Sequence, residues 1–396
     1  ITVTSSLIRP AGTAWCSRYV ERHRKMKLGI KDWEFLHPSL EPILGETHDV
    51  CAFQEDVTKI CRQVAGLSYK EADRIRKQMN CSREGAVQQR EWERTARNFI
   101  RGCMGHTGLT RKQAVELWER VASFSGFSFC KSHSAGYAAL SFRCTYLKAY
   151  YPAQFLAAVI SNNHGFYTRE VYLEEARRWG IRILPLHVNH STVAWEGKHA
   201  WIRPGLMHLR GLRRESMEGI VAERRRGGPY ANLVDFLRRT NTHRTETEHL
   251  VLVGAFDGFG MTRPELVYLL DGIYDELRPR QPSLFGNKGV HRTFELHPGL
   301  TDYSLAQRCI HELELLGFML SGNILDILDL HPCARDAVPA ADIKHFAGRR
   351  VKLFGRPIAR RVHHTANGGR AMMFLTLEDR SECADVILWP DIYERY

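Results

Sequence analysis

The sequence predicts a mainly α-helical protein of several domains that ends in a small β-structure. Its 396 residues are enough for two to four domains, each with a core of its own. Capping boxes, in which Ser or Thr is followed three residues later by Glu or Gln, precede amphipathic stretches at Ser68–Glu71, Thr110–Gln113 and Thr262–Glu265. From Val351 the pattern changes to short strand-like runs separated by turn residues. We therefore expect helices over most of the chain and strands near its end.

The composition favours a polyanionic partner. The chain has 56 Lys and Arg residues against 44 Asp and Glu residues, which gives a formal net charge of +12. A basic protein without such a partner is the alternative. No run of 18 or more apolar residues occurs and the first residues do not resemble a signal peptide, so we expect neither a membrane nor export, and a cytoplasmic location.

Cysteine and histidine spacing does not indicate a metal site. The ten cysteines include no C-x-x-C pair, so we expect reduced and mostly packed thiols. His363 and His364 are adjacent, but neighbouring residues of a strand point to opposite faces. We therefore expect no metal ligands in this chain.

The first 165 residues or so are predicted to be helical and basic. The box at Ser68–Glu71 starts a helix that runs to about Met79. On a helical wheel Arg76 lies beside the buried stripe of this helix, whereas Lys77 points away from it. The buried stripe is formed by Ala72, Ile75 and Met79.

Basic residues continue after this helix. From Arg74 to Arg101 there are eight Arg and Lys residues against three Glu residues. This excess predicts either contact with phosphate groups or a solvated basic face, and both remain open on the sequence alone.

The tetrad Lys131-Ser132-His133-Ser134 is the best candidate for an anion site. It follows the helix that begins at Thr110–Gln113 and starts another helix. Small residues at positions 135, 136, 138 and 139 would let another strand, base or helix come close to this second helix. A helix start with a lysine and hydroxyl groups suits a phosphate or polyphosphate. The alternative is a capped core helix with a solvated lysine, in which His133 is a satisfied core histidine.

Residues 166–275 have a different pattern. A helix ending near Gly180 is followed by a short strand predicted over Ile181–Val188 and a hairpin predicted over Trp195–Ile202. Two units similar to helix-hairpin-helix modules come next. A turn at Leu209–Arg213 precedes a helix over about 215–226, and a helix over about 246–253 precedes the glycine-rich turn 254–260.

These hairpins predict contact with DNA that does not depend on base sequence, because their backbone N–H groups can bind a phosphodiester. Arg213 stands where the first module would have its second glycine, so its tight turn is in doubt. Helix packing alone is the alternative interpretation. The candidate DNA-binding residues are Gly211, Arg213, Gly254, Gly258 and Gly260.

The remaining chain is a linker and a set of strands. Residues 277–300 are rich in Pro, Gly and Arg and contain Gln281-Pro282-Ser283-Leu284-Phe285, which suits a short linear ligand with two apolar anchors. Packing of Leu284 and Phe285 on their own domain is the alternative. Strands are predicted over 351–362, 371–377 and 384–389, with turns between them.

Several of these stretches, in this order, resemble the alpha subunit of bacterial DNA polymerase III, the family C replicative polymerases. They include KSHSAGYAALSFRCTYLKAYYPAQFLAAVIS from residue 131, AFQEDVTKICRQVAGLSYKEADRIRKQM from residue 52 and WIRPGLMHLRGL from residue 201. The variant VISNNHGFY, from residue 159, looks more like the error-prone, lesion-bypass branch.

The resemblance implies four domains and a DNA-directed DNA polymerase as the parent enzyme. Residues 1–165 would be the fingers, 166–275 the helix-hairpin-helix region, 276–345 a linker with a helix, and 346–396 part of an oligonucleotide-binding (OB) barrel that guides single-stranded template. The palm carboxylates that hold Mg²⁺ in the parent enzyme have no counterpart here, so we expect this chain alone to be inactive.

The resemblance also implies roles and partners. Arg76 and Lys77 would face the triphosphate of an incoming deoxynucleoside triphosphate, with Lys131, Ser132 and His133 nearby. Asn80, Cys81 and Ser82 replace the glycine and lysines that usually follow. Gln281, Leu284 and Phe285 would bind the sliding clamp, and primer-template DNA and other polymerase or mutagenesis subunits would complete the assembly. A non-catalytic DNA-binding module of a repair or accessory protein, or a structural protein with a basic surface, are the competing hypotheses.

Overall fold

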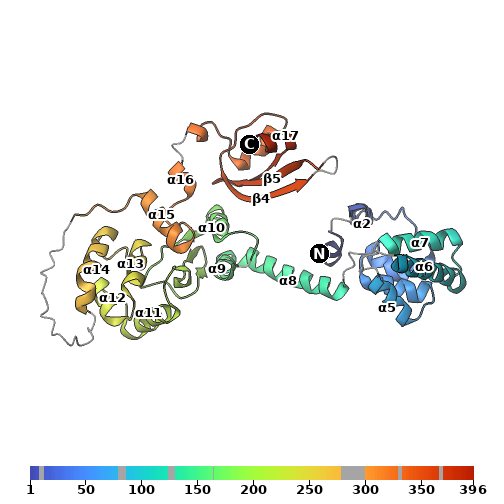
Figure 1. The fold of residues 1–396 in the computed structure, drawn as a ribbon, viewed down its shortest axis with the longest axis horizontal. Coiled ribbons are helices and arrows are strands. Elements are labelled where there is room, and N and C mark those ends of the chain that lie inside the picture. Colours follow the sequence, from blue (N-terminus) through green and yellow to red (C-terminus); the bar gives the residue numbers. More distant parts are fainter. Residues whose placement is uncertain are drawn as a thin grey trace. The chain divides into compact units, whose positions relative to one another are not determined.

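The computed structural model describes residues 1–8, 13–78, 86–123, 130–163, 165–277, 299–328, 332–364 and 369–396. Two compact units are found, residues 1–145 and residues 146–396 (Figure 1). Most elements in both are helices, which confirms the prediction of a mainly α-helical, multidomain chain. The finer division into four domains stays a prediction. Among the described residues, none of the helices is long and apolar enough to span a bilayer.

The first unit is built from short and medium helices. Helix α8 (Lys131–Tyr150) starts in this unit and ends in the second. The other helices of the first unit are α1 (Thr2–Leu7), α2 (Thr13–Lys27), α3 (Glu41–Leu44), α4 (Gln54–Lys59), α5 (Tyr69–Gln78), α6 (Ala86–His106) and α7 (Arg111–Ser123).

Local sequence explains where α5 and α7 begin. The Ser68 N–H and hydroxyl both donate to Glu71 Oε2, at 2.9 and 2.5 Å. The Thr110 N–H and hydroxyl donate to Gln113 Oε1 in the same way, at 3.0 and 2.9 Å. Both predicted capping boxes are therefore confirmed. On α5 the predicted stripe residues Ala72 and Ile75 are buried.

The core of the first unit joins α5, α6 and α7 to a π-helical turn, Ile60–Val64, that continues α4. Trp118 of α7 packs against Trp92 and Phe99 of α6, with ring centroids 4.7 and 5.2 Å apart. Gly102 lets α6 approach this turn, because a Cβ there would lie 2.1 Å from the Ala65 carbonyl oxygen. The π-helical turn is thus packed against α6 in the core of the first unit.

The second unit contains helices and two small sheets. Its helices after α8 are α9 (Pro152–Asn162), α10 (Arg169–Arg178), α11 (Arg214–Gly227), α12 (Leu233–Arg239), α13 (Arg244–Leu252), α14 (Arg263–Leu277), α15 (Leu305–Leu316), α16 (Ile324–Leu328) and α17 (Pro390–Arg395). Its strands are β1 (Arg182–Ile183), β2 (Glu196–Lys198), β3 (Trp201–Arg203), β4 (Arg356–His364), β5 (Ala371–Glu378) and β6 (Cys383–Leu388).

The first sheet confirms one prediction and corrects another. β2 and β3 form the expected antiparallel hairpin, and β1 pairs in parallel with β3. The strand predicted over Ile181–Val188 is wrong beyond Ile183. The chain turns after Pro185, where the His187 N–H donates to the Ser191 hydroxyl instead of to a neighbouring strand. A proline within a short run cannot donate to a ladder, which favours this early end.

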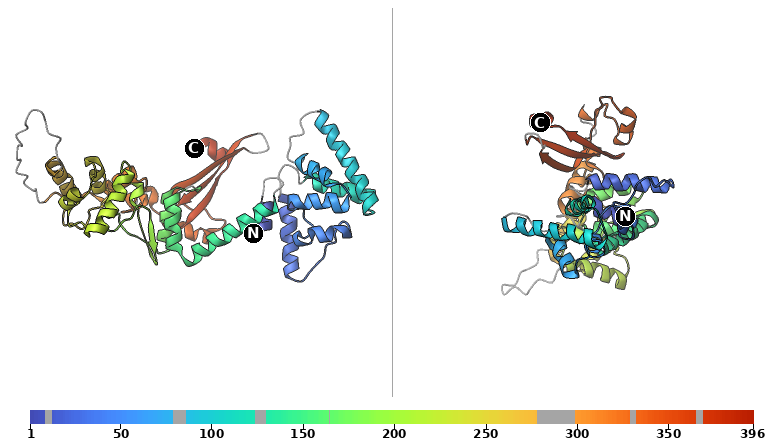
Figure 2. Two further views of the ribbon diagram at one scale, coloured as in Figure 1. Left: turned by 90° about the horizontal axis from the view of Figure 1, so that it is seen from below. Right: turned by 90° about the vertical axis from the view of Figure 1, so that its right-hand side faces the viewer.

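The second sheet has the order β4, β5, β6 and is antiparallel throughout (Figure 2). The three predicted strands are confirmed, with bounds shifted by a few residues. His363 is opposite Met372 and His364 is opposite Ala371, so the two histidines face opposite sides of the sheet. Whether this sheet is part of an OB barrel stays a prediction.

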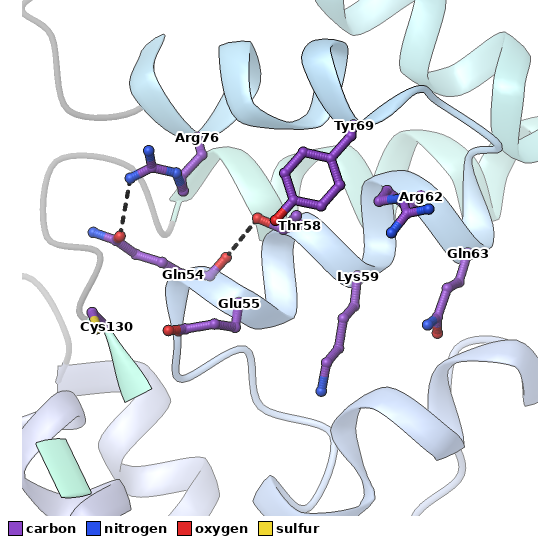
Figure 3. A pocket seen from close by; sticks show the side chains of 9 residues that line it. All are labelled: Gln54, Glu55, Thr58, Lys59, Arg62, Gln63, Tyr69, Arg76 and Cys130. Carbon is purple, nitrogen blue, oxygen red and sulfur yellow. Dashed lines mark hydrogen bonds between the residues drawn. The ribbon is translucent and has the colours of Figure 1, made fainter. Parts of the chain in front are cut away.

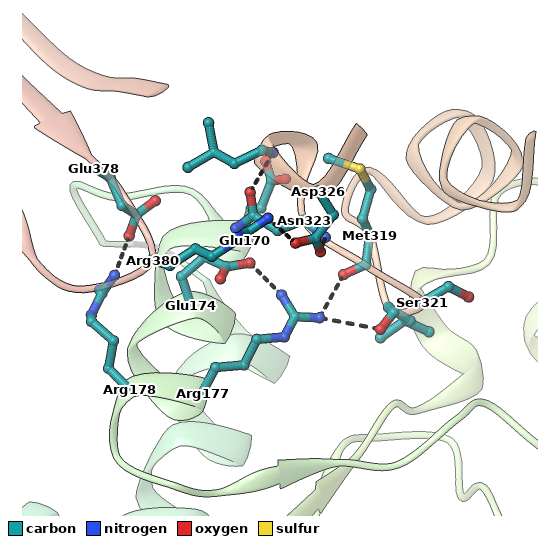
Figure 4. Close-up of polar contacts among 12 residues, drawn as sticks. Glu170, Glu174, Arg177, Arg178, Met319, Ser321, Asn323, Asp326, Glu378 and Arg380 are labelled. Atoms are coloured by element: carbon teal, nitrogen blue, oxygen red, sulfur yellow. Dashed lines mark hydrogen bonds and ion pairs between the residues drawn. The ribbon is translucent and has the colours of Figure 1, made fainter. Parts of the chain in front are cut away.

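An ion network anchors this sheet within the second unit, and Figure 4 shows its Arg178–Glu378 pair. Glu378 of β5 has a side chain that is 2% exposed and lies between two arginines, Arg178 of α10 at 2.9 Å and Arg356 of β4 at 2.7 Å. Arg356 also pairs with Glu170 at the start of α10. Because breaking a buried pair leaves an uncompensated charge, this network holds the sheet to α10.

Candidate nucleic-acid interface

A pocket of about 430 Å³ opens on the first unit (Figure 3). It is formed by α4, the π-helical turn and α5, with a contribution from the residue before α8. Its lining residues are Gln54, Glu55, Thr58, Lys59, Arg62, Gln63, Tyr69, Arg76 and Cys130. Three cations and one carboxylate are among these lining residues, so the pocket suits an anionic ligand.

Arg76 is held in a fixed orientation at this pocket. Its Nε and Nη2 donate to Asp73 Oδ1 at 3.0 and 2.8 Å, and its Nη1 donates to Gln54 Oε1 at 3.2 Å. The side chain is still 32% exposed, so part of the guanidinium can meet a ligand. Lys77 pairs with Asp73 at 2.9 Å and is 69% exposed, but it is not among the pocket's lining residues.

Of the residues that line this pocket, sequence reasoning found only Arg76, and it missed Lys59, Arg62 and Tyr69 among others. Lys59 and Arg62 are one helical turn apart, and the Arg62 guanidinium lies 5.1 Å from the centroid of the Tyr69 ring. The i,i+3 spacing of the two cations was the available signal. Together they add positive charge and an aromatic face beside Arg76.

The start of α8 is already occupied by carboxylates. The Lys131 N–H donates to Glu55 Oε2 at 2.9 Å, and Lys131 Nζ pairs with Glu46 Oε2 at 2.5 Å. The hydrogen bond to Glu46 raises the pKa of Lys131. An anion at a helix N-terminus is what its unpaired N–H groups favour. In this structure acidic side chains of the same unit occupy the start of α8, and the anion site predicted there stays a prediction.

Ser132 and His133 lie on a different side of α8. The His133 ring packs edge-on against Tyr137, with centroids 4.6 Å apart. Both predicted residues line a second hollow of about 430 Å³ with Tyr137, Gly136 and Leu140. The Ser132 hydroxyl is 2.7 Å from Cys130 Sγ. The five predicted nucleotide-binding residues therefore form separate groups around the start of α8 and around the α5 pocket.

The described carboxylates do not fit a two-magnesium site. No cluster of three or more His, Cys, Asp or Glu side chains that could hold a metal ion is found in the described ranges. Asp56 Oδ2 accepts the N–H groups of Ala52 and Phe53, at 3.1 and 2.9 Å, and burial raises its pKa to about 6. The Asp56 carboxyl group is thus engaged by the backbone at the start of α4.

The first hairpin forms its turn despite Arg213. Gly211 adopts φ +80°, a left-handed conformation that glycine reaches without steric cost, and Arg213 is in extended backbone just before α11. His249 Nδ1 lies 2.8 Å from the Arg210 carbonyl oxygen. This contact joins the turn to α13 of the second hairpin.

Arg213 is engaged with a buried carboxylate. Its N–H and Nε donate to Glu246 Oε1 at 2.8 and 2.9 Å, and the Ser216 hydroxyl and the His243 N–H donate to the same carboxylate. Burial opposes ionisation of Glu246, but these bonds outweigh it and lower its pKa to about 2. Arg213 and Glu246 thus tie the two hairpins together.

The second hairpin runs from α13 to α14 through three left-handed glycines, Gly254, Gly258 and Gly260. A Cβ at Gly254 would lie 2.2 Å from Arg263 Nη2, so this position requires glycine. The Arg263 side chain is 4% exposed and pairs with Asp257 at 2.8 Å. The Thr262 N–H donates to Glu265 Oε2 at 2.7 Å, which confirms the third capping box.

Two groups of predicted residues lie outside the described ranges. They are Met79, Asn80, Cys81 and Ser82, which follow the last described residue of α5, and Gln281, Leu284 and Phe285 in the linker. The clamp-binding prediction therefore rests on the sequence alone.

Comparison with protein families agrees with this geometry. Residues 1–103, which include the Arg76 pocket apart from Cys130, match the finger domain of the bacterial DNA polymerase III alpha subunit. Residues 180–266, which include both hairpins, match a helix-hairpin-helix motif. The chain is similar to bacterial DNA polymerase III alpha subunits. The predicted resemblance is therefore confirmed.

Curated relatives extend the similarity to the whole chain. The DNA polymerase III subunit alpha of Treponema pallidum is 29% identical over 99% of this chain and 34% of its own length. The corresponding subunit of Staphylococcus epidermidis is 29% identical over 100% of this chain and 36% of its own length. An error-prone DNA polymerase of Symbiobacterium thermophilum is 28% identical over 100% of this chain and 40% of its own length. The chain thus spans little more than a third of the length of these polymerases.

Proposed function

We propose that this chain is the nucleotide-binding and DNA-binding part of a template-directed DNA polymerase. The observation that carries the proposal is the position of Arg76, which stands at a cationic pocket in the region that matches the polymerase finger domain. A fixed, partly exposed guanidinium with further cations beside it suits a triphosphate, which carries several negative charges.

In this proposal the cations divide the work of binding the incoming nucleotide. Arg76 binds the triphosphate, supported by Lys77 and by Lys131 at the start of α8. Ser132 and His133 face the nucleotide from the hollow that they line on α8. A nucleotide at the start of α8 would replace Glu55 and Glu46, because an anion already occupies that position.

The second unit would bind primer-template DNA through its hairpins. The backbone N–H groups around Gly211, Gly254, Gly258 and Gly260 supply contacts that do not read the base sequence. Because the Arg213 guanidinium is bonded to Glu246, we propose that Arg213 positions the hairpins, with direct DNA contact as the alternative role. The C-terminal sheet would guide single-stranded template as part of an OB barrel.

We assign no magnesium ligand to this chain. The Mg²⁺ ions of the parent polymerase would lower the barrier to attack by the primer hydroxyl and stabilise the leaving pyrophosphate. The residues described here would bind and orient the triphosphate for that reaction. The stretch from Val159 to Tyr167 favours lesion-bypass synthesis over the main replicase.

Substitution of Arg76 tests the nucleotide-binding role. In the full-length polymerase, Arg76→Ala should lower kcat/KM by a similar factor for all four nucleotides, because a phosphate contact cannot read the base. Charge-assisted hydrogen bonds of roughly 1.5 to 3 kcal/mol correspond to a loss on the order of 10- to 200-fold. Lys70→Ala, on the exposed start of the same helix, is the matched control. Unchanged kinetics in the Arg76 variant would contradict the proposal.

We also propose that the linker segment Gln281–Phe285 tethers the sliding clamp. Burying Leu284 and Phe285 would contribute roughly 1.5 to 3 kcal/mol each, and DNA held by both proteins would raise the local concentration enough for this weak contact. Replacing both residues by Ala should abolish clamp binding in a pull-down assay and leave clamp-independent synthesis intact. Ser283→Ala is the control. Clamp binding at wild-type affinity by the double variant would overturn the assignment.

A further inference from the structure

Four arginines form a stripe along α6. Arg90, Arg94, Arg97 and Arg101 are spaced by four, three and four residues, and all are exposed. At 100° per residue these spacings place the four side chains within an arc of about 60°. We call this set the arginine stripe.

The arginine stripe lies opposite the core face of the helix. Trp92, Phe99 and Cys103 of α6 are buried, and on the helical wheel they are about 180° from the arginines. The stripe positions are therefore not part of the core, and core packing does not require arginine at them.

Little charge neutralises the arginine stripe within the protein. Among the described residues, ion pairing of the stripe is limited to Arg97 with Glu93, at 4.0 Å. Arg94 lines a pocket of about 150 Å³ with Glu91 of α6 and with Arg74 and Glu71 of α5. Arg74 adds a further cation beside Arg94, and the charge of the Glu71 carboxylate, which caps α5, partly offsets it.

The length of the stripe suits a nucleic-acid strand. With a rise of 1.5 Å per residue, the eleven steps from Arg90 to Arg101 cover about 17 Å. One strand of duplex DNA carries a phosphate every ~3.4 Å along the axis, so this length spans about five phosphates. A row of phosphates could contact all four guanidinium groups, whereas a single small anion could contact only one or two of them.

We propose that the arginine stripe of α6 binds the sugar–phosphate backbone of DNA. This contact is separate from the hairpins of the second unit and from the Arg76 pocket, and it rests on the proposed DNA-binding function. Its chemistry is electrostatic, so it contributes affinity without base preference and weakens as salt rises.

The test is the salt dependence of binding by the full 396-residue chain to a labelled primer-template duplex. Replacing all four stripe arginines by Gln should reduce the magnitude of the slope of log K against log salt by about 3.6 and weaken binding on the order of 1,000-fold at ~0.1 M salt. The matched variant with four Lys residues keeps the charge and should retain the wild-type slope. The double variant Arg90→Gln/Arg97→Gln should show about half of the slope change that the quadruple variant shows. It replaces the quadruple variant in this test if the quadruple variant unfolds.

The outcomes separate this inference from the proposed function. A wild-type chain that binds DNA, with Gln variants of unchanged slope and affinity, would overturn the stripe assignment alone. A wild-type chain that binds no DNA would overturn both. Polyglutamate is a second probe, and tighter binding of polyglutamate than of DNA through the same arginines would assign the stripe to an acidic protein partner and contradict our proposal.

Discussion

The first unit and the hairpins of the second unit use the same residue type for different tasks. Arg76 stands at the mouth of a pocket and is bonded to Asp73, whose side chain is 34% exposed. Arg213 is bonded to Glu246, which is 2% exposed, and Arg263 is itself buried. An arginine tied to a buried partner stabilises the fold, whereas one on an exposed rim can serve a ligand. Net charge alone does not distinguish the two.

Two buried carboxylates show the same difference. Asp56 in the first unit accepts two backbone N–H groups, and burial dominates, so its pKa is raised to about 6. Glu246 in the second unit accepts bonds from Arg213, Ser216 and His243, so its pKa is lowered to about 2. Burial disfavours the ionised form of both carboxyl groups. At Glu246 the hydrogen bonds from Arg213 and its neighbours outweigh this effect on the pKa, whereas at Asp56 burial prevails.

The largest expected effect is at Glu246. Glu246→Gln should lower the free energy of unfolding of the second unit by about 3 kcal/mol at neutral pH, because it removes the buried anion that accepts hydrogen bonds from Arg213, Ser216 and His243. Urea unfolding followed by circular dichroism measures this loss. The control is Glu218→Gln, which breaks the exposed pair with Arg214 and should change stability little. Equal effects of the two variants would remove the distinction between the two regions.

The pH dependence of Glu246 has a definite sign. Its folded pKa of about 2 lies below the ordinary value of 4.5, so its contribution is complete above about pH 4.5 and declines as pH falls toward 2. The Gln variant should therefore differ most from wild type at neutral pH.

Asp56 should behave in the opposite way. Its folded pKa of about 6 exceeds the ordinary value of 3.8, so the folded chain binds the extra proton and stability falls as pH rises from about 4 to 6. Asp56→Asn keeps an oxygen acceptor for the cap and removes this dependence. The free energy of unfolding of the variant, relative to that of the wild type, should therefore increase by about 2 to 3 kcal/mol as the pH rises from 4 to 7.5. A difference that does not change with pH would show that burial does not control this group.

The smallest predicted effect concerns the carboxylate at the start of α8. Glu55→Gln removes the charge that occupies the helix N-terminus, so in the full-length polymerase the KM for nucleotides should fall about 2- to 5-fold. Glu41→Gln, which breaks an exposed pair with Lys31, is the control. A raised KM would mean that Glu55 helps to bind the nucleotide or its metal instead of competing with it.

Local features were the most predictable from the sequence. The capping boxes before α5, α7 and α14 depend on residues three positions apart, and they form as expected. The three C-terminal strands follow from strand-like runs that are separated by turn residues. Beyond Ile183, in contrast, the structure has a turn that involves Pro185 and Ser191 in place of the predicted strand. A short run of apolar residues does not by itself distinguish a strand from other structure.

Contacts between distant segments could not be predicted in this way. The Arg76 pocket joins α4, the π-helical turn and Cys130, and Glu55 reaches Lys131 across 76 positions of sequence. The Arg213–Glu246 pair joins residues 33 positions apart. Neither pairing has a local signature, because each depends on how helices pack. Sequence reasoning therefore found Arg76 and Lys131 but not the acids that engage them.

The most direct test compares Arg76→Ala with Arg213→Ala in the full-length polymerase, by nucleotide KM and melting temperature together. Arg76→Ala should raise KM at least about tenfold and change the melting temperature by no more than a degree or two. Arg213→Ala should lower the melting temperature by several degrees, because it leaves Glu246 buried without a cation, and should leave KM nearly unchanged. An Arg76 variant that melts early with an unchanged KM would contradict the assignment of this pocket to the nucleotide.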